Sequence, residues 1–249
     1  MSNCRLFCPI IAEGSITLSA EESHHAISSL RARPGQEVVL FDGAGGEATA
    51  VIRQIARRRL VVDVVRRVHR PFDLSFRLTL AVALPRAHRQ GYLIEKCTEL
   101  GVAAIWPITS DRSVTRPDAA AVEKWSRRAI EAAKQSHLCW VPLIAAPRTF
   151  TESLKYIGDF ARCAITDVDS FRADTPAKSV PFSIFLAGSP AGASILAAVG
   201  PEGGWTDDEV ALAVHAGAVR TTLAPTILRT ETAAVAVCAA VALADRCSS

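Results

Sequence analysis

The chain has 249 residues, of which 49% are hydrophobic and 21% are charged, and its formal net charge is +3. This composition excludes a disordered chain, and the length allows one large domain or two domains of moderate size. The longest apolar run, residues 233–244, is shorter than the roughly 20 residues that a membrane-spanning helix needs. It therefore predicts a buried helix of a soluble protein. The N-terminus also lacks the pattern of a signal peptide, so we expect a cytoplasmic protein with no membrane partner.

The seven cysteines are scattered along the sequence, and none belongs to a CxxC pair. An odd and scattered set is not typical of a disulfide framework or of a zinc site. We therefore expect reduced and mostly buried thiols, and no metal site.

The first 70 residues have mainly the hydrophobic pattern of β-strands. Strands are expected at residues 16–18, 37–41, 47–55 and 60–68, and the last two segments alternate apolar and polar residues as half-buried antiparallel strands do. Ser19 and Glu22 have the spacing of a capping box, which predicts a helix over residues 20–31. Arg70-Pro71 marks the exit from this module. The predicted domains are therefore 1–72 and 73–249.

The positive charge is concentrated in this first module. Residues 1–70 hold ten arginines and seven acidic residues, whereas the remainder holds 18 basic and 18 acidic residues. Such a cluster suits a phosphate backbone, because nucleic-acid binding is largely electrostatic. The alternative is a solvated strand face in a chain with 23 Arg and only 5 Lys. The candidate RNA-binding residues, one of them in the later domain, are Arg31, Arg33, Arg53, Arg57, Arg58, Arg59, Arg66, Arg67 and Arg112.

From residue 75 onward, strand patterns alternate with helix patterns, which is typical of a parallel sheet covered on both faces. The expected strands are 76–84, 103–108, 161–166, 183–186, 195–199 and 219–223. The expected helices are 90–100, 118–138, one that starts at the capping box Thr206–Glu209, and 231–246. The fold class predicted from this order is an α/β domain that follows a small β-rich module.

A glycine-rich segment, Gly43-Ala-Gly-Gly-Glu-Ala48, matches the dinucleotide-binding pattern GxGxxA. That function requires a helix directly after the glycines. A strand pattern follows instead, so we interpret the segment as a hairpin turn. The sequence motifs of phosphate-binding loops, zinc proteases and α/β-hydrolases do not occur in the chain.

A second glycine-rich segment, Gly200-Pro-Glu-Gly-Gly204, lies between the buried strand 195–199 and the helix that starts at Thr206. Ligands of open α/β sheets bind at the carboxyl ends of strands, and glycines allow the backbone to approach a ligand closely. The alternative is an ordinary tight turn. Glu202 in this apolar context is expected to have a partner, because a buried unpaired carboxylate is costly.

The segment 223–233 also leaves a strand and enters a helix. Glu231 favours the positive end of the helix dipole, whereas Arg229 opposes it. An arginine held against the local field is a candidate for binding an anion or a substrate. The alternative is a salt bridge from Arg229 to Glu231 or to Glu202.

Taken in order, five stretches of the chain resemble the SPOUT superfamily of methyltransferases. Within it they are similar to the family that methylates N3 of a uridine in bacterial 16S ribosomal RNA. The stretches are HHAISSLRARPGQEVVLFDG, LIEKCTELGVAAIWPITSDRS, EAAKQS, VGPEGGWTDDE and LAPTILRTETA. The sequence departs from the family pattern at Ala224, where a glycine is usual, and at Leu138, where an arginine is usual.

The resemblance implies a PUA-like RNA-binding β-barrel at the N-terminus and a C-terminal α/β domain with a parallel sheet and a trefoil knot. It further implies S-adenosylmethionine as cofactor, 16S ribosomal RNA or the small ribosomal subunit as substrate, and a homodimer. Arg229 is the expected catalytic residue, with Glu202 or Glu231 as the alternative bases. The expected cofactor-binding residues are Val199, Gly200, Pro201, Glu202, Gly203, Gly204, Leu223, Ile227, Leu228 and Thr230.

Two other functional classes are open at this point. One is a nucleic-acid-binding protein without chemistry, and the other is a dinucleotide-dependent oxidoreductase. Binding of S-adenosylmethionine rather than a nicotinamide dinucleotide would separate the three.

Overall fold

The computed structural model describes residues 4–72, 74–167 and 179–244, and it forms two compact units. The first unit consists of the described residues up to Phe72 together with Ile130–Val141. The second unit consists of Leu74–Ala129 and the described residues from Pro142 onward. The end of the long helix expected over residues 118–138 therefore belongs with the N-terminal module.

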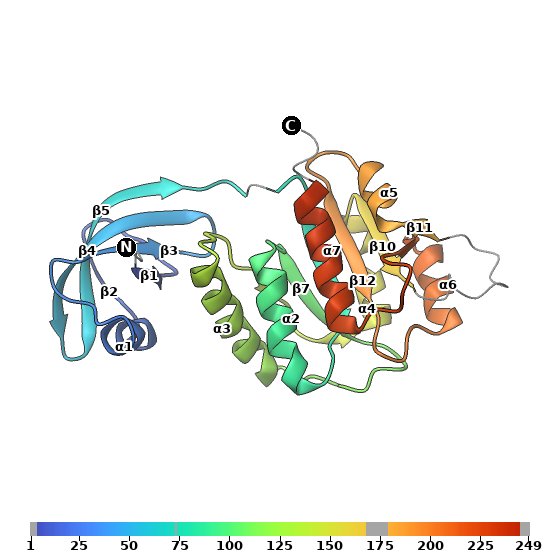
Figure 1. Cartoon of the computed structure of the whole chain (residues 1–249), viewed down its shortest axis with the longest axis horizontal. Coiled ribbons are helices and arrows are strands. Elements are labelled where there is room, and N and C mark those ends of the chain that lie inside the picture. The colour runs from blue at the N-terminus through green and yellow to red at the C-terminus, as the bar shows by residue number, and fades with distance from the viewer. Residues whose placement is uncertain (1–3, 73, 168–178, 245–249) are drawn as a thin grey trace. The chain divides into compact units, whose positions relative to one another are not determined.

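The first unit is built on a five-stranded sheet with the order β1-β3-β4-β5-β2 (Figure 1). Its elements are β1 (Cys4–Phe7), β2 (Ser15–Thr17), α1 (Ala20–Ser28), β3 (Glu37–Phe41), β4 (Gly46–Ala56) and β5 (Arg59–His69). The alternating segments of the sequence form the long antiparallel pair β4–β5, as predicted. Their inward residues, among them Ile52, Leu60 and Val62, are buried in one apolar cluster.

The glycine-rich segment at residues 43–46 is a turn between β3 and β4, which confirms the hairpin interpretation. The Asp42 carboxylate accepts hydrogen bonds from the backbone N–H groups of Ala44 (2.7 Å) and Gly46 (2.8 Å). Gly43 and Gly45 have positive φ angles, of 78° and 95°, that residues with a side chain rarely adopt. Strand β4 follows directly, so no helix N-terminus is available to bind a pyrophosphate.

Helix α1 is shorter than predicted, and only half of its expected capping box is formed. Ser19 caps the helix by accepting from the Glu22 backbone N–H, but the helix ends at Ser28, and Arg31 lies beyond it with φ 53°. The Glu22 side chain turns away from the cap. One of its oxygens accepts from the Phe7 backbone N–H (3.1 Å), and the other pairs with Lys134 (2.5 Å).

Residues 130–141 complete the first unit through polar contacts. The side chains of Lys134 and Glu22 are only 4% and 7% exposed, so their ion pair is buried. Arg5 donates to the Leu138 carbonyl (2.8 Å), and the Trp140 indole donates to the Arg70 carbonyl (3.0 Å). The backbone of Leu138, the position where the family usually has arginine, is therefore part of this attachment.

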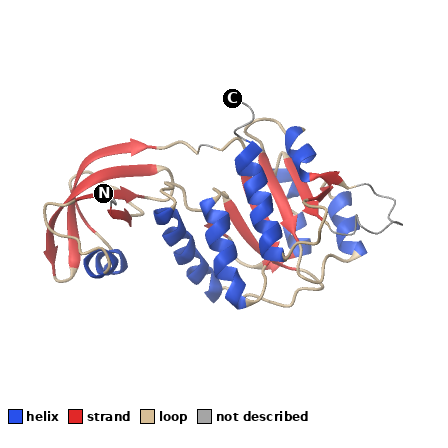
Figure 2. Cartoon of the chain, in the orientation of Figure 1, coloured by secondary structure: helices blue, strands red, loops and turns tan. Residues whose placement is uncertain are grey.

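The second unit is built on an eight-stranded parallel sheet with the order β11-β13-β10-β12-β6-β7-β8, and β9 pairs with β7 as well. The strands are β6 (Arg77–Ala83), β7 (Ala104–Thr109), β8 (Leu143–Ile144), β9 (Arg148–Thr149), β10 (Arg162–Thr166), β11 (Val180–Pro181), β12 (Ser194–Val199) and β13 (Val219–Thr222). Strands β6, β7, β10, β12 and β13 were predicted from the sequence. Figure 2 shows helices on both sides of this sheet, as the alternating pattern predicts.

The helical elements of this unit are α2 (Ala87–Glu99), α3 (Ala120–Gln135, which continues into the first unit), α4 (Phe150–Leu154), the 3-10 turn η1 (Ile157–Asp159), α5 (Phe182–Ala187), α6 (Asp207–His215) and α7 (Thr230–Ala244). The capping box at Thr206 and Glu209 is present in full. The prediction of a strand at 183–186 was wrong, because these residues form α5, with Phe182, Phe185 and Leu186 buried at helical spacing. No helix in the described ranges is long and apolar enough to span a membrane.

Candidate functional site

A pocket lies at the carboxyl ends of the neighbouring strands β10, β12 and β13. It holds about 620 Å³ of empty space, its open mouth included, which is in the range of small-molecule sites. Each of the three strands contributes the segment that follows it. The lining residues are Thr166, Asp167, Val199, Gly200, Pro201, Glu202, Gly204, Trp205, Leu223, Ala224, Thr226, Ile227, Leu228, Thr230 and Ala233.

The loop after β12 is shaped by a turn and by a tryptophan. The Gly204 N–H donates to the Pro201 carbonyl (2.9 Å), and Gly204 has φ 71°. The Trp205 indole donates to the Thr166 carbonyl (2.8 Å), and its ring packs on Phe150 with centroids 4.5 Å apart. A Cβ on Gly200 would lie 2.9 Å from this indole. Glycine at position 200 is therefore required by the packing of Trp205.

The loop after β13 closes the other side of the pocket. The Thr230 hydroxyl donates to the Gly200 carbonyl (3.1 Å), which joins this loop to the loop after β12. Ile227 is 77% exposed and Leu228 is half-buried, so both offer apolar surface to a ligand. Ala224 is not among the residues with positive φ. Its methyl group is therefore accommodated without the backbone strain that a left-handed conformation would impose.

Nine of the ten residues expected to bind the cofactor line this pocket, and the exception is Gly203. A Cβ on Gly203 would meet the Arg112 Cβ at 3.1 Å, so this position faces a neighbouring loop. Arg112 donates to the carbonyls of Gly203 (3.2 Å) and Trp205 (3.1 Å). The guanidinium expected to contact RNA therefore also holds the loop after β12.

Several lining residues were not predicted from the sequence. These residues are Thr166 and Asp167 at the end of β10, and Trp205 just before α6. No sequence motif indicated that β10 takes part in the site. Asp167 directly follows an apolar strand that ends beside the strand of the glycine-rich loop. The position of an acidic residue at the end of a parallel strand was the signal that could have identified it.

The three candidate catalytic residues occupy different environments. Arg229 is exposed at the start of α7, and within the described part of the chain its guanidinium has no hydrogen bond or ion pair. Glu202 is exposed on the pocket lining, which contradicts the expectation of a buried carboxylate with a partner. Neither of the salt bridges considered for Arg229 forms.

Glu231 is buried and pairs with Arg89 of α2 (3.0 Å). Its Oε2 atom is buried without a hydrogen-bond partner among the described residues. Thr230 and Ala233 line the pocket, whereas residue 231 is turned by about 100° from residue 230 around the helix. The Glu231 side chain therefore joins the starts of α7 and α2.

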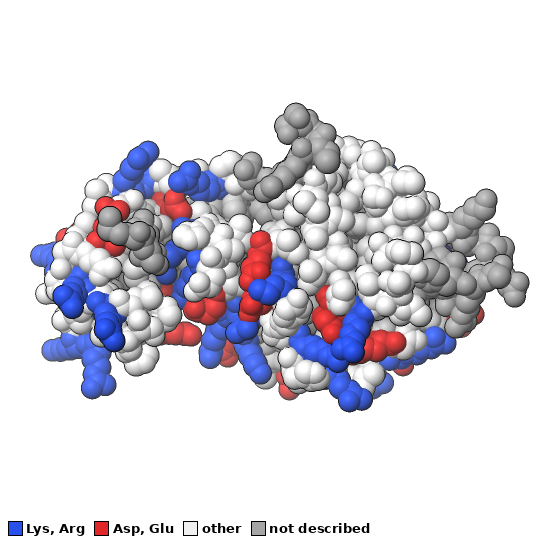
Figure 3. Space-filling view, in the orientation of Figure 1, with Lys and Arg blue, Asp and Glu red and all other residues white. Residues whose placement is uncertain are grey.

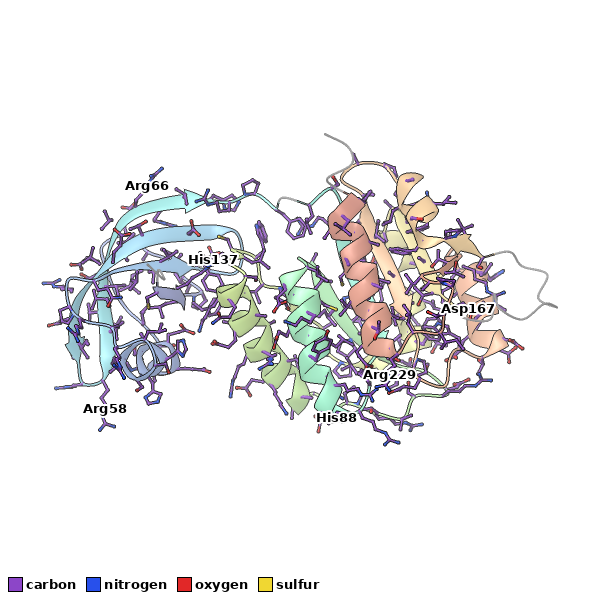
Figure 4. All side chains as sticks on the ribbon, viewed as in Figure 1. Arg58, Arg66, His88, His137, Asp167 and Arg229 are labelled. Atoms are coloured by element: carbon purple, nitrogen blue, oxygen red, sulfur yellow. The ribbon has the colours of Figure 1, made fainter. Side chains whose placement is uncertain are left out.

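The arginines of the first unit do not form one continuous patch. Arg59 and Arg66 are seven residues apart on β5, which corresponds to roughly 23 Å along a strand. Figures 3 and 4 agree, since basic side chains are spread around this unit and Arg58 and Arg66 lie at opposite ends of it. Arg57, Arg58 and Arg59 form one group at the β4–β5 turn. Arg53 lies earlier on β4 and donates to the Ser15 hydroxyl (3.2 Å), and Arg33 lies in the loop before β3.

Arg57 and Arg58 form the two-residue turn between β4 and β5, with φ angles of 49° and 62°. Both are exposed. Such a turn favours asparagine and glycine, and bulky residues adopt it at an energetic cost. Two arginines in this conformation point to a function for their side chains rather than for their backbone.

Several arginines of the first unit, Arg59 at the turn among them, have protein partners. Arg59 donates to the Leu18 carbonyl (3.2 Å), and Arg70 pairs with Glu47 (3.1 Å). Burial opposes ionisation of Glu47, but hydrogen bonds from Arg5, Cys139 and Arg70 outweigh it and lower the pKa of this carboxyl. Glu47 therefore stays ionised at neutral pH and offsets part of the positive charge at this end of β5.

The described cysteines are six free, buried thiols, as expected, and Cys247 lies outside the described residues. In the same part of the chain, no group of three or more His, Cys, Asp or Glu side chains could hold a metal ion.

The chain matches two protein families that agree with this architecture. Residues 73–242 match the RNA methyltransferase domain, and residues 18–65 match the RNA methyltransferase PUA domain. Among curated proteins, the chain is 33% identical to ribosomal RNA small subunit methyltransferase E of Synechocystis, over 90% of this chain and 71% of that protein. It is 30% identical to the Bacillus subtilis protein of the same name, over 88% of this chain and 86% of that protein.

Among solved structures, ribosomal RNA small subunit methyltransferase E from Neisseria gonorrhoeae, bound to S-adenosyl methionine, superposes with a TM-score of 0.81. The two chains are 29% identical, and the match covers 96% of each. Sequence family, sequence relatives and fold therefore agree over nearly the whole chain. The protein belongs to the ribosomal RNA small subunit methyltransferase E family, with an RNA methyltransferase domain preceded by a PUA domain.

Proposed function

We propose that the protein transfers a methyl group from S-adenosylmethionine to N3 of a specific uridine in 16S ribosomal RNA. The observation that carries the proposal is the pocket at the ends of β10, β12 and β13, whose lining includes residues of two of the five stretches that carry the family resemblance. The homologous enzyme from Neisseria gonorrhoeae, with the same fold, was solved with S-adenosyl methionine.

The pocket residues fit this cofactor. The mouth is apolar at Ile227 and Leu228, which suits an adenine ring. Among residues 199–204 and 223–228, the lining backbone groups that make no hydrogen bond within the protein can bind the polar groups of the ligand. Asp167 supplies a buried carboxylate in the lining. When bound, S-adenosylmethionine supplies an electrophilic methyl group on a sulfonium centre.

The chemistry at the uracil requires control of a proton. N3 of uracil is a neutral imide at pH 7, and it becomes nucleophilic as it loses its proton. The site must stabilise the negative charge that develops on the ring, or accept the proton. In this proposal Arg229, exposed at the start of α7 between the lining residues Leu228 and Thr230, donates hydrogen bonds to a uracil carbonyl or a flanking phosphate. Glu202, exposed on the lining, takes the proton directly or through water.

Glu231 has a different role in this proposal. Its carboxylate is held by Arg89 at the start of α2, on the side of α7 that does not line the pocket. It therefore fixes the first turn of α7, from which Arg229 projects.

The target base must be unpaired or flipped out of a helix to reach the methyl group.

The experiment that tests the function is methylation of RNA from a strain that lacks the gene. Small subunits from that strain are incubated with the protein and isotope-labelled S-adenosylmethionine, and the rRNA is mapped by mass spectrometry. We expect one labelled methyl group on N3 of a single uridine. Binding of the subunit without transfer of label would instead support a binding protein without chemistry.

The cofactor site is tested by replacing Gly200 with alanine. The new Cβ would lie 2.9 Å from the Trp205 indole, so the loop must shift and the hydrogen bond from Trp205 to Thr166 is strained. We expect the affinity for S-adenosylmethionine to fall at least about 10-fold in calorimetry, since the loop that approaches the ligand is displaced. Gly158→Ala is the matched control, because a Cβ there meets nothing within 4 Å. Equal affinities of the two variants would refute the assignment.

We further propose that the arginines around the β4–β5 turn bind phosphates of the RNA. The exchange of Arg57-Arg58 for Asn-Gly supplies the residues that this turn prefers and removes two positive charges. We expect a higher melting temperature but weaker binding of unmodified small-subunit rRNA. The slope of log affinity against log salt should fall by about 0.7–0.9 for each phosphate that the variant no longer binds.

The matched control is Arg57→Lys with Arg58→Lys, which keeps both the charges and the backbone strain. This variant should retain the salt slope, and both variants should bind S-adenosylmethionine normally. If the Asn-Gly variant keeps the affinity and the salt slope of the parent protein, the turn does not contact RNA.

We also propose the homodimer and the trefoil knot that the family resemblance implies. Residues Thr232, Ala236, Ala239 and Leu243 follow the i, i+4, i+7, i+11 spacing of one face of α7, and Leu243 is 62% exposed. The α7 side of the second unit is almost without charged side chains in Figure 3. An uncharged helix face of this kind supports association with a second copy.

A further inference from the structure

One buried ion pair in the second unit lies at the pocket itself. Asp167 is 5% exposed and follows β10, where its backbone N–H donates to the Thr221 carbonyl (2.9 Å) of β13. Arg220 of β13 is 8% exposed, and its Nε and Nη2 atoms both lie 2.5 Å from the Asp167 Oδ2 atom. The carboxylate is therefore fixed in position by backbone and guanidinium together.

A contribution to the stability of the fold does not by itself explain why this ion pair is buried. Buried ion pairs are costly to desolvate and are often no better than apolar residues of similar size. Asp167, however, is part of the pocket lining, between the loops after β12 and β13. The other acidic residue of the lining, Glu202, is exposed. Asp167 thus differs from the rest of the lining as a rigid, buried hydrogen-bond acceptor.

We propose that Asp167, oriented by Arg220, accepts hydrogen bonds from the ribose hydroxyls of S-adenosylmethionine. This assignment rests on the proposed function and adds a specificity-determining residue to it. The Arg220 guanidinium is paired with the carboxylate and offsets its negative charge. Such a group suits neutral donors, such as hydroxyls, better than the cationic ammonium group of the methionine half. A site built to bind a hydroxyl discriminates strongly against a ligand that lacks it.

The first test uses the unchanged protein and needs no variant to fold. Calorimetry compares 5′-methylthioadenosine, which retains the nucleoside half of the cofactor, with its 2′-deoxy and 3′-deoxy forms. We expect at least one deoxy form to bind about 10–100-fold more weakly, because the buried carboxylate loses a donor. Equal binding of all three compounds overturns the proposal.

The second test uses Asp167→Asn, with Asp208→Asn at the exposed start of α6 as control. We expect Asp167→Asn to bind methylthioadenosine about 10–100-fold more weakly and to lose the discrimination against the deoxy form, whereas the control keeps both properties. If the variant binds S-adenosylmethionine weakly but methylthioadenosine normally, Asp167 faces the methionine half, and the proposal is wrong while the proposed function stands. Failure of the unchanged protein to bind either compound overturns both.

Discussion

Replacing Arg229 with alanine is expected to lower the single-turnover methylation rate by about 10²–10³-fold, the effect of removing one preorganised donor that stabilises developing charge. The side chain is exposed and has no hydrogen bond or ion pair with a described residue, so its removal leaves no buried partner uncompensated. Melting temperature and S-adenosylmethionine affinity should therefore stay close to those of the parent protein. The three quantities are measured on the same preparation.

Two further variants separate catalysis by Arg229 from a general effect of charge. Arg229→Lys should restore the rate only in part, since an ammonium group does not reproduce the planar fork of a guanidinium. Arg127→Ala removes an exposed arginine that pairs with Glu123 on α3, and it should leave the rate unchanged. A normal rate for Arg229→Ala at low temperature, together with early melting, would make this arginine structural.

The second large effect is expected in the first unit, where Lys134→Met leaves the Glu22 carboxylate buried without its cation. Breaking a buried ion pair in this way costs about 3–5 kcal/mol. The loss should be local, so the measurement is native-state hydrogen exchange followed by mass spectrometry. Backbone amides of β3, β4 and β5 should lose protection, and those of β10 and β12 should keep it.

The control for Lys134 is the double variant with Glu22→Gln. An amide at position 22 can still accept from the Phe7 N–H, and it removes the buried charge. The double variant should therefore be more stable than Lys134→Met alone. If Lys134→Met exchanges like the parent protein, the ion pair contributes nothing to the stability of this unit.

Periodicity and turn residues were sufficient to predict most of the fold. The alternating segments of the first module have a pattern that few other structures satisfy, and they form β4 and β5. The apolar runs at 76–84 and 195–199 form β6 and β12. The segment at 183–186 failed because a short apolar run fits a buried helix as well as a strand. Only its packing in the second unit, with Phe182 and Phe185 on one side, decides between them.

The pocket could be predicted only where a loop has its own signature. The glycines at 200–204 and the unusual Arg229 are visible locally, so both loops were found. Asp167 and Trp205 were missed because they belong to the site only through the position of β10 between β12 and β13. The order of strands in a sheet cannot be predicted from a local segment of sequence. The partner of Glu231 was missed for the same reason, since Arg89 is 142 positions away in the chain.

The discontinuous first unit has a consequence for synthesis of the protein. Phe72 and Ile130, which belong to the same unit, are 58 positions apart. A ribosome that adds 5–20 residues per second needs roughly 3–12 s to make the intervening chain. During that interval Glu22 and the strands around it have emerged, but the lysine that neutralises this buried carboxylate has not been made. The first unit therefore cannot be completed until residues 130–141 have been made, and a chain that ended at Phe72 would lack the cation that pairs with Glu22.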